Sequence, residues 1–205
     1  MTNEYFGGLD FGSSGARISI IDKSKEIIFE DSCIYNYEFK NPEGWINSCI
    51  KLFEGIPIQI KINLSRLSIS GTSGTLVPCS SNGTPLGNSI PYYEVCTSNP
   101  EKLNLIAGED KFLNNPYSSL AKAIKLIDIF GDDIILRHQA DWISGWFLND
   151  WSFGEEGNNV KLGWNIENKS WPESFESFSL TKSIPVIKES GSILGKINQS
   201  IANLL

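Results

Sequence analysis

The chain has 205 residues, a length that suits one domain, with or without an insertion. Its composition of 40% hydrophobic, 11% aromatic and 20% charged residues is that of a globular protein and excludes disorder as the main state. The formal net charge of −7 disfavours nucleic acids and anionic membrane surfaces as partners, because both are negatively charged. No apolar run approaches the length of a bilayer span, and the first residues do not form a secretory signal. We therefore expect a cytoplasmic protein that does not cross a membrane.

The cysteines and the single histidine limit the chemistry further. Cys33, Cys49, Cys79 and Cys96 contain no C-x-x-C pair, so we expect core or bystander thiols rather than zinc or redox ligands. His138 is the only histidine in the sequence, which excludes every metal motif that needs two histidines. Any Ser-His-Asp proposal then depends on this one residue.

Three strands and a helix are predicted at the start of the chain. Residues 5–9 and 16–22 are strand-like segments on either side of a turn, and residues 26–35 predict a third strand. After a turn or helix-start signal at residues 41–44, apolar residues recur at helical spacing over 45–53 and predict an amphipathic helix.

A fourth strand and two loops are predicted next. Residues 64–70 predict a core strand, which ends in the small-residue loop 71–74, where a ligand could approach the backbone. Residues 75–90 predict a surface hairpin, and residues 97–116 predict a loop with short helical pieces. The order of three strands, a helix and a strand favours an α/β domain with a mixed sheet over a Rossmann fold.

The second half of the chain is predicted to be mainly helical. Residues 117–130, closed by Gly131, and residues 141–148 predict helices, and a short helix is expected to start at Trp171. Asp141 is expected to cap its helix. Five tryptophans in this half could stack on a sugar, although packing between helices is the commoner reason for such residues. They are Trp142, Trp146, Trp151, Trp164 and Trp171.

The turn between the first two strands is the first candidate site. Asp10 ends the first strand, and two glycines and two serines follow at residues 12–15. Successive backbone N–H groups in such a turn form an anion-binding concavity, and a nearby carboxylate can hold Mg²⁺. The alternative is a plain hairpin turn in which Asp10 bonds its own backbone. The segment is neither a Walker A loop nor a dinucleotide-binding fingerprint.

Five segments, in chain order, resemble the FGGY carbohydrate kinases. Residues 9–17 resemble the family's first phosphate motif, and residues 69–86 resemble its sugar-site loop and the hairpin after it. The other three are similar to its A-D-W helix start, its K-L-G segment and a Pro-Val stretch, at residues 140–143, 158–164 and 180–195. The variant looks closest to the xylulose/ribulose kinase branch of cyanobacteria and plants. The resemblance implies an α/β, RNase H-like (actin-like ATPase) domain, whose mixed sheet is flanked by helices.

The resemblance also implies an activity and site residues. The activity is phosphoryl transfer from ATP, with Mg²⁺, to a ketopentose such as D-ribulose or D-xylulose. Asp10 would position Mg²⁺ and the transferred phosphate, while Arg17 is expected to be structural and Lys161 to reach the sugar cleft or remain a solvated surface charge. The implied phosphate contacts are Gly12, Ser13, Ser14 and Gly15. The implied sugar contacts are Ser73, Gly74, Thr75, Tyr92 and Glu94. Gly15 stands where the family usually has Ser or Thr, and Glu94 stands where it has Asp.

Members of this family are considerably longer, and their general-base Asp and adenosine pocket would lie beyond Leu205. We therefore expect residues 1–205 to be an incomplete N-terminal sugar-kinase domain that is inactive alone and lacks the C-terminal nucleotide-binding domain. Its partner would be that domain or a second copy, because a bare apolar surface favours self-association. One alternative is a non-catalytic sugar-binding or regulatory remnant. A remote one is a serine esterase using Ser73, Asp128 and His138, although the serine loop lacks the final glycine of a nucleophile elbow.

Overall fold

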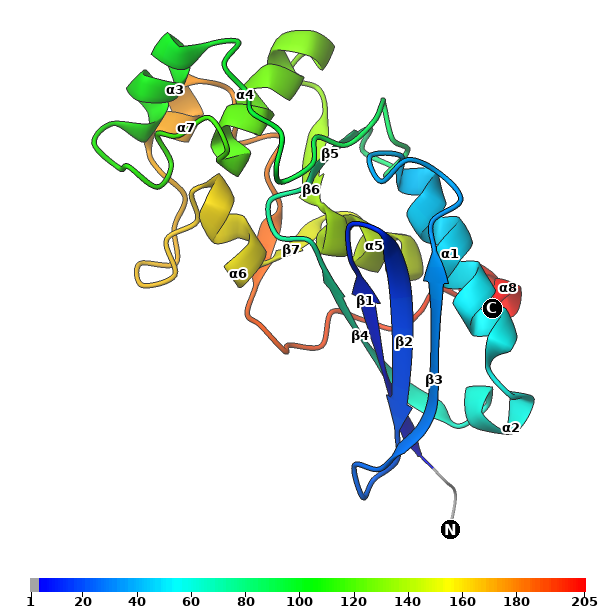
Figure 1. Cartoon of the computed structure of the whole chain (residues 1–205). Helices are drawn as coiled ribbons and strands as arrows, with labels where there is room; N and C mark the ends of the chain where they lie inside the picture. Colours follow the sequence, from blue (N-terminus) through cyan, green and yellow to red (C-terminus); the bar gives the residue numbers. More distant parts are fainter. Residues whose placement is uncertain (1–3) are drawn as a thin grey trace. The chain divides into compact units, whose positions relative to one another are not determined.

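The computed structural model describes residues 4–205, which divide into two compact units (Figure 1). Unit 1 comprises residues 4–72 together with Asn198–Leu205, and unit 2 comprises Ser73–Ile197. Within the described residues, none of the helices has the length and apolar character needed to span a bilayer.

Unit 1 is built on a four-stranded sheet with the strand order β3-β2-β1-β4. Strands β1 (Tyr5–Phe11), β2 (Gly15–Ile21) and β3 (Ile27–Ile34) pair antiparallel in succession, whereas β4 (Leu64–Gly71) pairs parallel with β1. The mixed sheet confirms the predicted fold class, and the four strands lie where the sequence predicted them.

Helix α1 (Pro42–Gly55) packs against β2 and β3 (Figure 1). The Asn41 side chain accepts a hydrogen bond from the Glu43 amide and caps the helix, which begins with proline in its first turn. The apolar residues of α1 and of the strands beneath it are buried together and form the core of this unit. They include Trp45, Cys49, Leu52, Phe53, Leu9, Ile18 and Ile20. Two short helices, α2 (Ile58–Lys61) and α8 (Gln199–Leu204), complete the unit.

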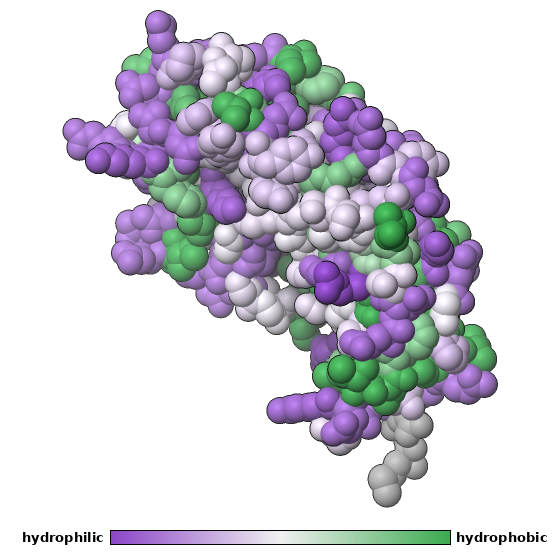
Figure 2. All heavy atoms as spheres, in the orientation of Figure 1, coloured by the Kyte–Doolittle hydropathy of each residue, from purple (hydrophilic) through white to green (hydrophobic). Residues whose placement is uncertain are grey.

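Unit 1 also exposes large apolar side chains. Figure 2 shows hydrophobic surface gathered at the lower end of the view, where Figure 1 has the start of β1 and the end of β2. Ile27, Ile58 and Ile62 are 58%, 60% and 73% exposed, and Ile34 on the edge strand β3 is 80% exposed. Such surface favours contact with another protein surface.

Unit 2 contains two short ladders surrounded by helices. Strand β5 (Leu76–Cys79) pairs antiparallel with β6 (Ile135–His138), and β7 (Phe153–Glu155) pairs parallel with β8 (Val186–Lys188). The helices are α3 (Pro100–Ala107), α4 (Ser119–Phe130), α5 (Gln139–Leu148), α6 (Glu156–Asn159), the 3₁₀ turn η1 (Val160–Leu162) and α7 (Ser174–Ser177). Leu120, Ala123 and Ile124 of α4 share one buried apolar cluster with Leu76 and Leu136.

Helix α4 has the stop signal that the sequence predicts, and it begins with a serine cap. The Ser118 hydroxyl accepts a hydrogen bond from the Ala121 amide, and the helix ends at Gly131, whose φ of 83° is in the left-handed region. Helix α5 and the helical piece α3 are confirmed as well. The short helix expected from Trp171 begins three residues later, after Glu173.

The prediction for residues 75–90 was correct for the turn and wrong for its exposure. The Gly83 amide donates to the Ser80 carbonyl at 2.8 Å, which closes the turn. Strand β5 is nevertheless completely buried, because Leu76 pairs with Ile90 on one side and with His138 of β6 on the other. Strand β6, which buries this edge, was not predicted.

Tryptophan packing and buried thiols agree with the sequence analysis. Trp142 Nε1 donates to the Gly83 carbonyl at 2.9 Å, and Trp151 Nε1 donates to the Trp142 carbonyl at 3.0 Å. A Cβ at Gly83 or Gly145 would lie 2.1 or 2.3 Å from the Trp151 indole, so these glycines make room for that ring. The four cysteines are free and buried: Cys33, Cys49, Cys79 and Cys96.

Candidate functional site

The first candidate site is the β1–β2 turn of unit 1. The Gly12 amide donates to the Gly15 carbonyl at 2.9 Å and closes the turn. Ser13 and Ser14 are exposed at its tip, and within residues 4–205 their amides donate to no other group. Two adjacent free amides form the start of an anion-binding concavity.

Asp10 is held by both strands that flank β1. Arg17 on β2 and Ser70 on β4 lie opposite Asp10 in the sheet register. The Ser70 hydroxyl donates to Asp10 Oδ1 at 2.8 Å, and Arg17 Nε lies 3.2 Å from Oδ2. The Asp10 side chain therefore bonds neighbouring strands rather than its own turn, and Arg17 has a structural contact.

The Asp10 carboxylate remains open to a ligand. Its side chain is 46% exposed, and Asp10 lies three residues before the first free amide of the turn. Mg²⁺ is usually bound by one or two protein carboxylates together with substrate phosphates, so a single carboxylate beside a phosphate cradle fits this ion. No group of three or more His, Cys, Asp or Glu side chains in the described part of the chain is arranged to hold a metal without such a ligand.

The backbone of β3 lies so close to Gly15 that it leaves no room for a side chain at this position. A Cβ at this position would lie 2.2 Å from the Cys33 carbonyl oxygen, a distance that no side chain tolerates without backbone movement. The structure thus gives a steric reason for glycine at the position where the FGGY kinases usually have Ser or Thr.

A second candidate site is a small hollow in unit 2, here named the Ser73 hollow. Its volume is about 180 Å³. It brings together residues from the start of the unit, the loop after α3, the start of α4 and η1. The lining residues are Ser73, Gly74, Tyr92, Phe112, Asn115, Tyr117, Ser118 and Lys161.

Three of the five implied sugar contacts line this hollow, and two do not. Ser73, Gly74 and Tyr92 are in the lining. Thr75 is fully buried, and its Oγ1 accepts a hydrogen bond from the Tyr92 amide at 3.2 Å, so it orients Tyr92 from behind. The carboxylate of Glu94 instead accepts from Lys125 Nζ at 3.0 Å.

Lys161 lies against the loop at the start of unit 2. Its Nζ donates to the Ser73 carbonyl at 3.4 Å. Gly74 has a φ of 89°, and a Cβ there would lie 3.3 Å from Lys161 Cδ, so glycine is favoured at this position. Of the two alternatives for Lys161, the structure has the one in which this lysine reaches the hollow.

Sequence reasoning missed Lys122, which lies behind the hollow. This lysine of α4 is fully buried, and its Nζ donates to the carbonyls of Tyr117 at 2.5 Å and Tyr92 at 3.5 Å. Burial, helped by the nearby charge of Lys161, lowers the pKa of Lys122 to about 8. Its signal in the sequence was a lysine between apolar residues on the buried face of a helix.

Asp141 corrects the predicted helix cap. The N-cap residue of α5 is His138, whose side chain makes no capping hydrogen bond, and Asp141 lies within the first turn. Asp141 Oδ1 instead accepts from the Glu155 amide at 3.0 Å, and Oδ2 accepts from Asn159 Nδ2 at 3.0 Å. Because Asn159 directly precedes η1, this buried carboxylate fixes the segment that carries Lys161.

The structure does not assemble the esterase constellation. His138 Nε2 lies 2.9 Å from Ser119 Oγ, and both side chains are buried. Asp128 accepts from Lys102 Nζ at 3.0 Å. Within the described residues, neither Ser73 nor Asp128 hydrogen-bonds to His138, so the predicted triad does not form.

Comparison with solved structures finds the same fold in several carbohydrate kinases. A xylulose kinase from Rhodospirillum rubrum matches 98% of the chain with a TM-score of 0.83 and 12% identity. The chain has the fold of one domain of these kinases. A glycerol kinase from Plasmodium falciparum, solved with ADP, matches 98% of the chain at a TM-score of 0.77 and 15% identity. A ligand-bound xylulose kinase from Lactobacillus acidophilus matches 98% of the chain with a TM-score of 0.77 and 12% identity.

These matches cover only part of each kinase. The chain spans 47%, 46% and 45% of the three solved chains, respectively, which is less than half their length. No protein-family model matches the chain. The shared architecture is the α/β, actin-like ATPase fold with a mixed sheet flanked by helices, as the sequence analysis predicts.

Proposed function

We propose that this chain is the sugar- and phosphate-contacting part of an ATP-dependent ketopentose kinase, with D-ribulose or D-xylulose as its sugar. The observation that carries the proposal is the β1–β2 turn. An open carboxylate, Asp10, lies three residues before the first of the two free amides, those of Ser13 and Ser14, in a fold shared with carbohydrate kinases.

The turn supplies the groups that a nucleotide triphosphate needs. The amides and hydroxyls of Ser13 and Ser14 would donate to phosphate oxygens, and Asp10, oriented by Ser70, would hold Mg²⁺. Mg²⁺ bound with ATP neutralises charge on the phosphates during transfer. Gly12 and Gly15 would contact the phosphates only through backbone.

The Ser73 hollow supplies the groups that a small polyol needs. Its lining offers the Ser73 hydroxyl, the Asn115 amide, the Lys161 ammonium and the ring of Tyr92. Polar groups of this kind orient sugar hydroxyls, and an aromatic ring covers the apolar face of a sugar. Thr75 would act through Tyr92 rather than by direct contact.

The hollow lacks one group that phosphoryl transfer to a hydroxyl requires. None of its lining residues is Asp, Glu or His, so no base for the sugar hydroxyl stands among the described lining residues. A carboxylate from a second domain would have to complete the site. The same observation favours the alternative, a non-catalytic sugar-binding module, when no such domain joins the chain.

The experiment is an ADP-release assay of the purified chain with Mg-ATP and D-ribulose, D-xylulose, glycerol or gluconate. Binding of a ketopentose by calorimetry without ADP release supports the proposal. Addition of a separately produced C-terminal kinase domain then distinguishes a kinase part from a non-catalytic sugar-binding module. ADP release that appears when this domain is added indicates a kinase part. Ketopentose-dependent turnover by the chain alone would contradict our inference that a base is missing.

A further inference from the structure

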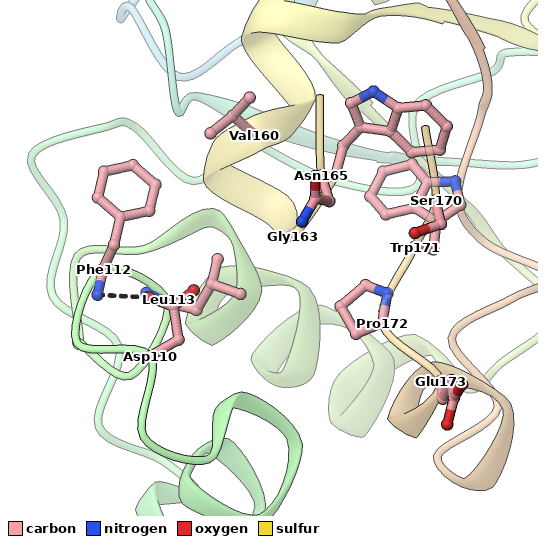
Figure 3. A pocket seen from close by; sticks show the side chains of 11 residues that line it. Asp110, Phe112, Leu113, Val160, Gly163, Asn165, Ser170, Trp171, Pro172 and Glu173 are labelled. Carbon is pink, nitrogen blue, oxygen red and sulfur yellow. Dashed lines mark hydrogen bonds between the residues drawn. The ribbon is translucent and has the colours of Figure 1, made fainter. Parts of the chain in front are cut away.

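Unit 2 also contains a second cleft, larger than the Ser73 hollow and here named the Trp171 cleft. Its volume is about 410 Å³, within the range of small-molecule sites. Figure 3 shows the loop of Asp110, Phe112 and Leu113 on one side and the segment of Ser170, Trp171 and Pro172 on the other. Phe112 borders both hollows, whereas every other lining residue belongs to one of them.

One wall of the Trp171 cleft is aromatic and is held from behind. The ring centroids of Trp164 and Trp171 are 5.3 Å apart in an edge-to-face arrangement. Trp171 also stacks on Phe175, with centroids 5.7 Å apart, and Phe175 is fully buried. The packing fixes the orientation of Trp171 before any ligand arrives. Unlike Trp142 and Trp151, these two tryptophans line an open space.

The other walls carry polar groups of both kinds. Asn165 Oδ1 accepts from the Asn168 amide at 2.9 Å, which leaves its side-chain NH₂ as a donor. Asp110 Oδ1 accepts from the Phe112 and Leu113 amides at 2.8 and 3.2 Å, which leaves Oδ2 as an acceptor. Within the described residues, the Ser170 hydroxyl has no hydrogen-bond partner, and it can both donate and accept.

This combination selects among ligand classes. An anion would be repelled by Asp110 and Glu173, and a cation would use the carboxylates but leave the Asn165 and Ser170 donors unsatisfied. An apolar ligand would bury these polar groups without partners. A neutral polyhydroxylated ring satisfies donors and acceptors with its hydroxyls and covers the tryptophan wall with its C–H face.

We infer that the Trp171 cleft binds the pyranose ring of a neutral saccharide. This site is separate from the Ser73 hollow and does not depend on the proposed kinase function. A solvent-accessible cleft with few hydrogen bonds binds a single sugar ring weakly, with a dissociation constant of about 1 to 10 mM.

The test uses methyl β-D-glucopyranoside, whose closed ring cannot become a ketose. Saturation-transfer NMR and indole N–H shifts follow its binding to the full chain, and Trp164→Phe and Trp171→Phe assign the indole signals. We expect shifts at these two indoles and about a tenfold loss of affinity in Asn165→Ala. Asn168→Ala, a neighbouring exposed asparagine outside the lining, is the matched control and should bind normally.

Two results would overturn the inference. One is the absence of shifts at both indoles up to about 50 mM saccharide, well above the expected dissociation constant. The other is displacement or replacement of the saccharide by tetramethylammonium at the same indoles, which would indicate a cation site. Because Trp171→Ala could unfold the packing around Phe175, the exposed Asn165→Ala variant is the decisive one. The proposed function has its own test, a ketopentose titration that compares wild type with Lys161→Met in the Ser73 hollow. Its outcome does not depend on whether the Trp171 cleft binds a saccharide.

Discussion

Lys122 Nζ donates a hydrogen bond to the Tyr117 carbonyl oxygen at 2.5 Å, and the same ammonium lies 3.5 Å from the Tyr92 carbonyl. Both tyrosines line the Ser73 hollow. One fully buried cation therefore ties two walls of the candidate sugar site together, from a helix whose other inward residues are mostly apolar. Hydrogen bonds to a charged group are among the stronger ones, so Lys122 stiffens the hollow.

Burial of Lys122 makes stability depend on pH in a defined window. Burial lowers its pKa from 10.5 to about 8, so between these pH values the unfolded chain binds more protons than the folded one. The free energy of unfolding of wild type should therefore rise with pH there, relative to Lys122→Met, by up to about 3 kcal/mol. Urea unfolding of both proteins from pH 7 to above pH 10 measures this. If the difference in unfolding free energy between the two proteins stays constant with pH, the lowered pKa of the buried Lys122 is contradicted.

The contact between Gly15 and β3 gives a steric prediction. Gly15→Ser should cost about 2 kcal/mol or more, because its Cβ would lie 2.2 Å from the Cys33 carbonyl oxygen and force β2 and β3 apart. Gly12→Ser is the matched control on the same turn. Its Cβ would lie 3.5 Å from the nearest atom, so we expect little change. Thermal unfolding of the two variants compares them, and equal stabilities would show that the strand spacing is not as described.

Asp141 gives a prediction about the segment that carries Lys161. Asp141→Asn keeps the shape of the side chain but turns one acceptor into a donor facing Asn159 Nδ2 or the Glu155 amide. We expect a loss of about 2 to 3 kcal/mol in unfolding free energy and weaker ketopentose binding. Asp132→Asn, an exposed aspartate in the same unit, should be within about 0.5 kcal/mol of wild type. A neutral Asp141→Asn would mean that this carboxylate does not fix the segment.

The exposed isoleucines of unit 1 predict self-association. Ile34 lies on the edge strand β3 and Ile62 precedes β4, the other edge of the sheet, and both are largely exposed. Edge strands with apolar side chains readily pair with another chain. Light scattering after size exclusion should show a concentration-dependent dimer that Ile34→Ser and Ile62→Ser weaken. Ile129→Ser, at a similarly exposed isoleucine of α4, should leave it unchanged, and a wild-type monomer at high concentration would refute the prediction.

Unit 1 could be predicted almost completely because its elements carry strong local signals. Short aromatic, apolar and β-branched runs next to turn residues indicated β1, β2 and β4, and Asn41 with Pro42 signalled the start of α1. The turn at Ser13 and Ser14 could be placed because two glycines bracket it. The close approach of Gly15 to the Cys33 carbonyl could not be predicted, since it depends on the register of the neighbouring strand β3.

Unit 2 was harder because its contacts join residues distant in sequence. Strand β6 has four residues, too few to show a periodicity, and its pairing with Leu76 decides that β5 is buried. Asp141 looked like a helix cap because that is the local use of such a residue, whereas its partner Asn159 is 18 positions away. The fold places Lys122 against the backbone of Tyr92, and no local rule indicates this.

The most direct measurement of the central claim is a titration of the folded chain with D-xylulose and D-ribulose, followed by backbone amide NMR. We expect shifts at Ser73, Gly74 and Tyr92, and about a tenfold loss of affinity in Lys161→Met, which removes the ammonium from the Ser73 hollow. Lys51→Met, at an exposed lysine of α1, is the matched control and should bind as wild type does. Shifts confined to other regions, or none with either ketopentose, would contradict the assignment of this hollow as the sugar site.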